Sequence, residues 1–191
     1  MLMTSRKTCY INGKSKTAPQ MLAVQLLQFL NDLSTSDLPP VFVCIGSDRV
    51  TGDSLGPLIG TSLSHTPAFP FPVYGTLHRP IHALNLESSI ETIRKRHPGS
   101  PMVAIDASLG TKRHQNYITI SVGSLCPGAG VDKELMEVGD ISITGIINLS
   151  GQYAQMSLQN TRLSTVMAMA SCISQGILLA CGEGGEWKQI L

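Results

Sequence analysis

The sequence lacks a marked excess of either charge. Its 14 Lys and Arg side chains stand against 13 Asp and Glu, the formal net charge is +1, and charged residues make up only 14% of the chain. Proteins that bind nucleic acid or acidic membrane surfaces generally carry a strong positive field. The composition therefore predicts no nucleic-acid partner and no membrane partner.

Paired cysteines and a secretion signal are also missing. The five cysteines, at positions 9, 44, 126, 172 and 181, are an odd number with neither a CxxC pair nor zinc-type spacing. This pattern predicts free thiols in a reducing cytoplasm. Residues 1–16 lack the apolar core and cleavage site of a secretory signal, so we expect the protein to stay inside the cell. Residues 163–180 are largely apolar, but polar side chains interrupt them, which favours a buried core helix over a membrane span.

Phosphate-binding glycine motifs are absent as well. Neither GxGxxG nor GxxxxGK[ST] occurs in the chain, so the sequence does not predict a dinucleotide or Walker-type site. Ser54 and Ser108 have no obvious histidine partner in the sequence. Cys44 lies inside an apolar run and is predicted to be a packing thiol rather than a nucleophile.

The apolar patterns that are present predict an α/β fold. Helices are expected over 19–31, 54–63, 82–97 and 158–181, and strands over 41–45, 73–75, 102–105, 117–122 and 141–147. The first three strands alternate with helices, which predicts right-handed crossovers and a parallel core. We expect one three-layer α/β domain over 1–191 with a mostly parallel central sheet, flexible ends at 1–18 and 183–191, and a long functional loop over 123–139.

Two carboxylates follow predicted strands. Asp53 lies in the loop after strand 41–45, and Asp106 directly follows strand 102–105. If these strands are parallel neighbours, the two side chains face each other across the crevice at the carboxyl ends of the strands. Two carboxyl groups at short range tend to share a proton, which makes one a general base and the other a general acid. The same pair can also hold a divalent metal.

Each acidic residue has a structural alternative. Asp53 could be the N-cap of the following helix, and Asp106 could cap a turn at the end of its strand. Asp48 could form an Asx-turn inside its own loop. His78 and His82 follow the second strand at the same edge of the sheet. We expect Asp48, Ser54, His78 and His82 to contact substrate, with a histidine able to polarise a carbonyl group or to bind a metal.

A combination of short motifs resembles a known family. The motifs are Phe42–Pro57, Tyr74–Leu77, Ile105–Ala107 and Leu158–Leu163. Together they resemble the YyaC family of predicted spore proteases, which is similar to the spore germination endopeptidase and, more remotely, to the hydrogenase maturation endopeptidases. The resemblance covers residues 20–180.

The resemblance implies a phosphorylase/hydrolase-like fold and a peptidase activity. Two aspartates are essential in the germination endopeptidase, and their positions correspond here to Asp53 and Asp106. The implied substrates are proteins or peptides such as small spore proteins, and the implied compartment is the forespore or spore core. No residue matches the later histidine of the hydrogenase relatives, so no metal ligand and no cofactor are assigned. A homo-oligomer is compatible with the sequence.

Three functions therefore remain open at this point. The first is an atypical aspartic-type endopeptidase in which Asp53 and Asp106 activate water. The second is a non-catalytic binding or regulatory module of sporulation on the same fold. The third is a metal-dependent maturation peptidase.

Overall fold

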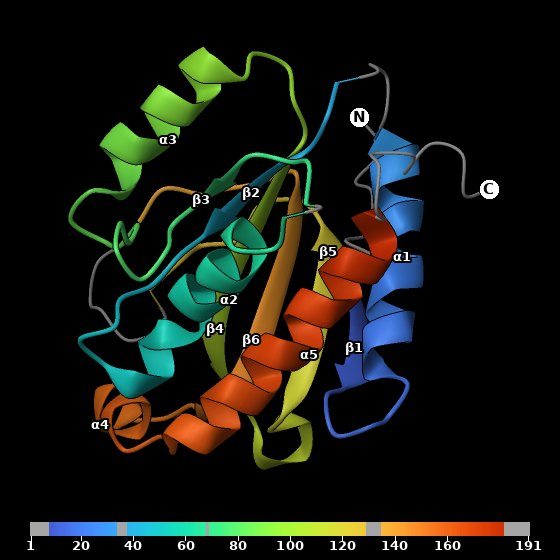
Figure 1. Ribbon diagram of the computed structural model, residues 1–191. Helices are drawn as coiled ribbons and strands as arrows, with labels where there is room; N and C mark the ends of the chain where they lie inside the picture. The colour runs from blue at the N-terminus through green and yellow to red at the C-terminus, as the bar shows by residue number, and fades with distance from the viewer. Residues whose placement is uncertain (1–7, 34–37, 68, 129–134, 182–191) are drawn as a thin grey trace, which may run out of the picture.

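A six-stranded mixed sheet forms the centre of the molecule (Figure 1). The computed structural model describes residues 8–33, 38–67, 69–128 and 135–181. The strands are β1 (Thr8–Asn12), β2 (Val41–Cys44), β3 (Val73–Tyr74), β4 (Met102–Gly110), β5 (Tyr117–Val122) and β6 (Ile141–Leu149), in the sheet order β1-β5-β6-β4-β2-β3. Strands β3, β2, β4 and β6 run parallel, β5 pairs antiparallel with β6, and the edge strand β1 pairs antiparallel with β5. The predicted α/β fold with a mostly parallel sheet is confirmed.

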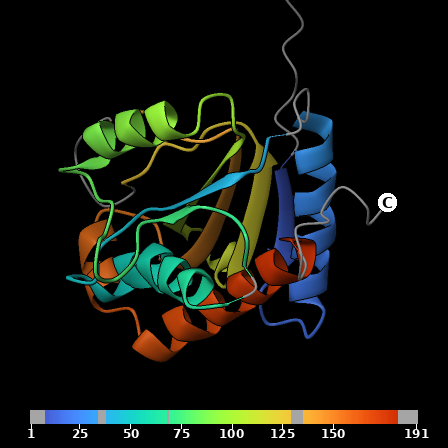
Figure 2. The same ribbon diagram turned by 45° about the horizontal axis from the view of Figure 1, so that its top comes forward.

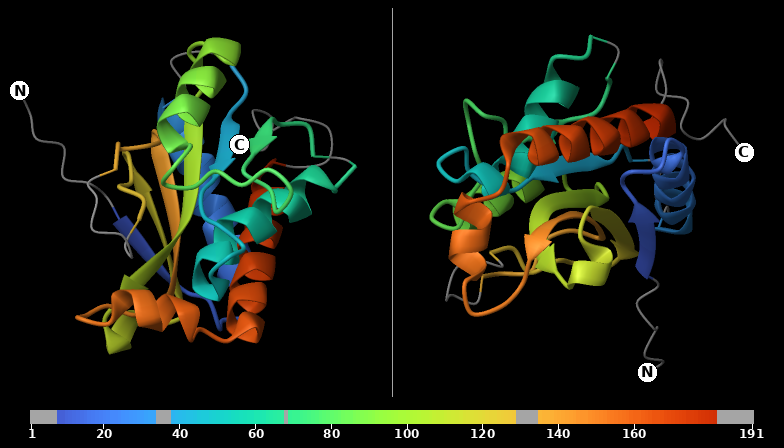
Figure 3. Two further views of the ribbon diagram at one scale, coloured as in Figure 1. Left: turned by 90° about the vertical axis from the view of Figure 1, so that its left-hand side faces the viewer. Right: turned by 90° about the horizontal axis from the view of Figure 1, so that it is seen from below.

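Helices cover the two faces of this sheet unequally (Figure 3). Helices α1 (Ala18–Leu33), α2 (Leu55–Ser64) and α5 (Leu163–Cys181) share one large apolar cluster with one face. Helix α3 (Leu86–Arg96) forms a smaller cluster with the other face, mainly over β2 and β4. Figure 2 shows α3 on one side of the sheet and α2 and α5 on the other. The short helix α4 (Ala154–Gln159) lies near one end of the sheet.

The order of the strands reverses at β2. The chain runs from β2 through α2 to β3 on one side, and then through α3 to β4 on the other side of β2. All four residues of β2 are buried and apolar, as expected for a strand that is covered on both faces. Ligand sites of open α/β sheets lie outside the carboxyl ends of the strands at such a reversal. The strand order therefore points to the region between the ends of β2 and β4, called the crevice below, as the candidate site.

Residues 8–18 are ordered parts of the fold, so the expected flexible segment over 1–18 is wrong for them. Strand β1 pairs antiparallel with β5, and Ile11 is buried in the main core. The sequence Thr-Cys-Tyr-Ile-Asn of β1 is largely polar, but its residues alternate between the two faces. Cys9 and Ile11 face the core. The predicted flexible end at 183–191 lies outside the described residues.

Two predicted boundaries also differ from the structure. Helix α3 begins at Leu86 rather than at residue 82, because His82 to Asn85 form a turn in which the Asn85 side chain accepts the His82 N–H at 2.8 Å. The expected helix over 158–181 is divided into α4 and α5. Thr161 lies at the break, where its hydroxyl donates to Ser157 O and accepts a hydrogen bond from the side-chain amide of Asn148 in β6.

Helix α5 is long and apolar enough to cross a membrane by length and composition, and half of that stretch is buried inside the structure. It packs closely on α1: a Cβ at Gly176 would lie 2.8 Å from Leu22 Cδ2. The helix thus has a partner for its apolar surface within the fold, which agrees with the prediction of a core helix.

Candidate active site

Asp106 lies within β4, and not at its end as the sequence predicted. The last residue pair between β2 and β4 is Cys44 with Ile105, so β2 stops one residue before Asp106. Strand β4 continues because β6 still pairs with it, and Asp106 is opposite Thr144. Asp106 therefore sits where the neighbouring strand ends and the crevice begins. The turn-capping alternative for this residue does not hold.

The carboxyl group of Asp106 is almost completely buried. The side chain is 4% exposed, and its Oδ1 accepts the Ala107 N–H at 2.7 Å. The Gly128 N–H also donates to it, from the long loop after β5. Burial raises the pKa of Asp106 well above its ordinary value, and the charge of Asp53 raises it further, although the two N–H donors act in the opposite direction.

Asp53 approaches the same crevice from the loop that follows β2. It lies in a short 3₁₀ turn, η1 (Thr51–Ser54), and is half-buried. The Asp53 carbonyl accepts the Ser47 N–H at 3.1 Å, which closes the loop on itself. Gly46 has φ +137°, and a Cβ there would lie 2.0 Å from Asp53 O, so a side chain at position 46 would displace the turn. The loop thus fixes the backbone of Asp53.

The N-cap alternative for Asp53 is wrong. Ser54 occupies the N-cap position of α2, Val50 that of η1, and neither makes a side-chain cap hydrogen bond. Burial raises the pKa of Asp53, while the Ser47 N–H and the electrostatic effect of His82 lower it. The groups that act on the Asp53 carboxyl group are therefore a loop N–H and a histidine rather than a helix terminus.

The two carboxyl groups belong to one electrostatic site. Asp53 is a cause of the raised pKa of Asp106, so the side chains lie within interaction range although they are distant in sequence. Their surroundings differ, because Asp106 is fully enclosed and Asp53 is half-buried beside His82. Asp53 therefore ionises first, and its charge favours the protonated form of Asp106.

The remaining predicted residues occupy different positions. His82 is half-buried and acts on Asp53, so it belongs to the crevice. His78 and Asp48 are exposed, and no contact joins either side chain to the carboxyl pair in the described part of the chain. The turn in the loop after β2 is formed by Ser47, whose Oγ accepts the Arg49 N–H at 3.3 Å, and not by Asp48.

Ser54 is enclosed by its own turn. Residues 52–56 read Gly-Asp-Ser-Leu-Gly and so match the GxSxG pattern of a nucleophile elbow. An elbow serine exposes its hydroxyl to substrate, whereas Ser54 is 5% exposed and its Oγ donates to Thr51 O at 2.7 Å. The hydroxyl is used in the turn, and the motif does not present a serine nucleophile here.

A row of hydroxyl groups continues from Asp106 along the sheet, and the sequence reasoning missed it. Ser108 shares the face of Asp106 in β4, and its Oγ donates to Thr144 Oγ1 at 3.2 Å. Thr144 Oγ1 lies 2.6 Å from Thr119 Oγ1 of β5. The alternation of polar residues in β5 and β6 was the available signal, since paired positions on adjacent strands face the same side.

Metal ligands and reactive thiols do not gather at this crevice. Within the described residues, no group of three or more His, Cys, Asp or Glu side chains is arranged to hold a metal ion. The cysteines form no disulfide. Burial raises the pKa of Cys44 and raises that of Cys181 to about 12, so both remain thiols at neutral pH and pack in the core.

Comparison with known proteins places the chain in a family. The family model described as "Protein of unknown function (DUF1256)" matches residues 10–176, a range that contains both carboxylates. The "Uncharacterized protein YyaC" of Bacillus subtilis (strain 168) is 48% identical over 151 residues, which are 79% of this chain and 73% of that protein. The resemblance inferred from the short motifs is confirmed. The chain belongs to the DUF1256 family and is a homologue of YyaC.

Proposed function

We propose that this protein is an aspartic-type endopeptidase in which Asp53 is the general base and Asp106 the general acid. One observation carries the proposal: two carboxyl groups from different segments lie near the strand-order reversal, within range of each other's charge, and Asp53 raises the pKa of Asp106. Pairs of titratable groups with unequal surroundings are the usual arrangement for acid–base catalysis near neutral pH.

We base the two roles on the unequal burial of the carboxyl groups. Ionised Asp53 takes a proton from a water molecule as the water oxygen attacks the peptide carbonyl carbon, while Asp106 gives its proton to the carbonyl oxygen. When the C–N bond breaks, Asp53 returns its proton to the leaving nitrogen, and Asp106 recovers a proton from the oxygen. The products are a carboxylic acid and an amine, and the pair ends with one shared proton as it began.

The position of His82 supports this assignment. Its electrostatic effect lowers the pKa of Asp53 and partly offsets the effect of burial, which favours the ionised form of the base. The Ala107 and Gly128 N–H groups hold the Asp106 carboxyl group in place. The likeness to peptidases with two essential aspartates adds a substrate class, so the proposal extends to small spore proteins as substrates and to the spore core as the compartment.

The test is hydrolysis in H₂¹⁸O of an acid-soluble protein extract of spores, followed by mass spectrometry of new peptide termini. The wild-type protein is expected to introduce ¹⁸O at new C-terminal carboxyl groups. Asp53→Asn and Asp106→Asn are each expected to lower the cleavage rate by about 100-fold or more, because each removes one acid–base group. Asp32→Asn removes an exposed carboxylate from α1 and serves as the matched control.

Circular dichroism establishes that the Asn variants are folded. Cleavage that persists in both folded Asn variants would refute the proposed roles. Tight association of the wild-type protein with a spore protein without any ¹⁸O-labelled fragment would refute the peptidase and indicate a binding module. Labelled cleavage that stops on addition of EDTA and returns with a divalent cation would indicate a metal-dependent peptidase instead.

A further inference from the structure

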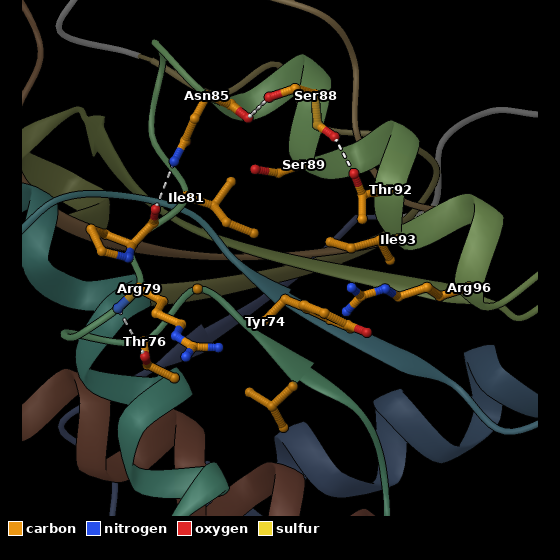
Figure 4. Close-up of a pocket in the computed structure, with 13 residues that line it drawn as sticks. Tyr74, Thr76, Arg79, Ile81, Asn85, Ser88, Ser89, Thr92, Ile93 and Arg96 are labelled. Atoms are coloured by element: carbon orange, nitrogen blue, oxygen red, sulfur yellow. Dashed lines mark hydrogen bonds between the residues drawn. The ribbon is translucent and has the colours of Figure 1, made fainter.

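A second concave site lies beside the crevice, between β3, the segment after it and α3 (Figure 4). Its volume is about 600 Å³. The cavity is lined by β3, by the turn residue Asn85 and by the side of α3 that carries Ser89, Thr92 and Arg96; the segment after β3 adds Gly75, Thr76, Arg79, Pro80 and Ile81. We call it the β3–α3 cavity. Its size is sufficient for an amino-acid side chain and part of a peptide backbone.

Two guanidinium groups define its charge. Arg79 enters from the segment after β3 and Arg96 from α3, so that they reach the same cavity from different elements (Figure 4). Among the residues that the structure describes, no Asp or Glu lines the cavity. Neither arginine forms an ion pair with a described residue, and Glu91 of α3 is already paired with Lys95 at 2.6 Å. The cavity therefore holds two positive charges that lack a negative partner in the described structure.

The other lining groups suit an oxyanion on an apolar stem. Ser89 Oγ makes no hydrogen bond within the described residues, whereas the Ser88 and Thr92 hydroxyls donate to backbone carbonyls of their own helix. The side chains of Ile81 and Ile93 form an apolar part of the wall. Arginine pairs and a free hydroxyl donate hydrogen bonds to a carboxylate, and the apolar wall accommodates its methylene groups.

The cavity is connected to the carboxyl pair by a short segment. Pro80 and Ile81 line the cavity, Ile81 O accepts the Gly46 N–H at 2.8 Å, and Ile81 bridges to Ile45 at the end of β2. The next residue is His82, whose charge acts on Asp53. A peptide that reaches the carboxyl pair can therefore place a neighbouring side chain in the β3–α3 cavity.

We propose that the β3–α3 cavity binds the carboxylate side chain of an acidic residue in the peptide substrate, with Arg79 and Arg96 as its partners. This inference rests on the proposed peptidase function, because only a peptidase would have this peptide as its substrate. Binding of the peptide itself requires no chemistry at Asp53 or Asp106. A peptide is favoured over a free anion because the cavity combines apolar wall with charge and adjoins β3, an edge strand whose outer backbone groups are unpaired by the sheet.

The probe is the peptide acetyl-Ala-Glu-Glu-Ala-amide, titrated into the full-length protein and followed by NMR shifts of backbone amides. Asp106→Asn protein is used in parallel so that the peptide stays intact. Shifts are expected at residues 74–79 and 88–96. The Arg79→Ala/Arg96→Ala double variant is expected to weaken binding by about tenfold or more, since charge-assisted hydrogen bonds are lost.

Matched controls identify the source of any binding. Arg94→Ala removes the same charge from an exposed position of α3 outside the cavity, and it is expected to leave the affinity unchanged. The peptide acetyl-Ala-Gln-Gln-Ala-amide is expected not to bind. Equal loss in Arg94→Ala and in the double variant, or equal binding of the Gln peptide, would overturn the proposal.

Two further outcomes separate this inference from the peptidase. Inorganic phosphate that shifts the same amides in an Arg79- and Arg96-dependent way, without a response to the Glu peptide, would overturn the peptide assignment. Labelled hydrolysis without peptide binding in the cavity would refute the cavity and leave the peptidase standing. Binding in the cavity by a protein that never introduces ¹⁸O would retain the acidic-peptide site and refute the peptidase.

Discussion

The two faces of the sheet are built from the same strands but have opposite compositions. In β4, Val103, Ile105 and Ala107 face the core under α1, α2 and α5, while Asp106 and Ser108 face the other side. The second face has an apolar half under α3 and, next to it, a half with Ser and Thr side chains that no described helix covers. Alternate residues of one strand thus supply stability on one face and polar groups on the other.

This division permits the buried carboxyl group of Asp106. Burial of a carboxyl group away from solvent costs folding free energy. The large apolar cluster on the opposite face stabilises the fold and offsets this cost. The comparison predicts that substitutions on the first face lower stability strongly. Substitutions in the half of the second face that carries the polar groups should have small effects on stability or even increase it, since functional groups commonly reduce the stability of a fold.

The largest stability effect is expected on the apolar face. Ile105→Ala removes a fully buried side chain next to Asp106 and should lower the free energy of unfolding by about 2–5 kcal/mol, because a cavity remains. Urea denaturation measures this loss. Val24→Ala on the exposed side of α1, where Val24 is 62% exposed, is the control and should cost much less. Equal losses of unfolding free energy in the two variants would contradict the prediction that the buried side of this face dominates stability.

An effect of opposite sign is expected at Asp106. Because the fold raises its pKa, the folded protein binds this proton more tightly than the unfolded chain. Its contribution to stability is present at pH below about 3.8 and is lost as the pH rises toward the higher folded pKa. Asp106→Asn cannot ionise, so its stability relative to wild type should increase with pH over this window and then level off.

Thermal unfolding between pH 4 and pH 8 measures this difference. Each kcal/mol gained raises the Tm by about 2–4 °C in a domain of this size. Asp32→Asn, at an exposed position of α1, should show a smaller dependence on pH. A destabilised Asp106→Asn protein at pH 7 would mean that the carboxylate contributes to stability and would contradict its assignment as the protonated acid.

The smallest effect is expected in the hydroxyl row. Thr144→Val keeps the shape of the side chain but removes the oxygen that joins Ser108 and Thr119, which should cost about 1 kcal/mol. The urea midpoint should fall while the m-value stays constant. Thr8→Val at the exposed edge strand is the control. A loss of unfolding free energy as large as that of Ile105→Ala would show that the hydroxyl row stabilises the fold as strongly as the apolar core does, which would contradict the comparison.

The sequence predicted which segments approach each other better than it predicted their local structure. The apolar run 41–45 and the βαβαβ alternation were sufficient to bring Asp53 and Asp106 to one crevice. The position of Asp106 inside β4 was not predictable, because Ala107 to Gly110 have no strong strand pattern and continue the strand only by pairing with β6. The length of β4 is therefore set by its pairing with β6 rather than by its own sequence.

Contacts between distant segments were also not predictable from the sequence, because they depend on how the elements pack. Nothing in residues 123–139 beyond length and glycine content indicated that the Gly128 N–H reaches Asp106. Arg79 and Arg96 belong to different elements, and only the placement of α3 beside β3 brings both to one cavity. Strand β1 is five residues long, too short for its alternation to be distinguished from a polar terminus.

The close contact of α1 with α5 has a consequence for biosynthesis. Helix α1 leaves the ribosome early, whereas α5 is the last of the described elements to emerge. Until then α1 and α2 lack the part of their apolar cover that α5 supplies, and nascent chains expose this surface to chaperones. The packing of this helical layer is therefore expected to be completed only once α5 has left the ribosome.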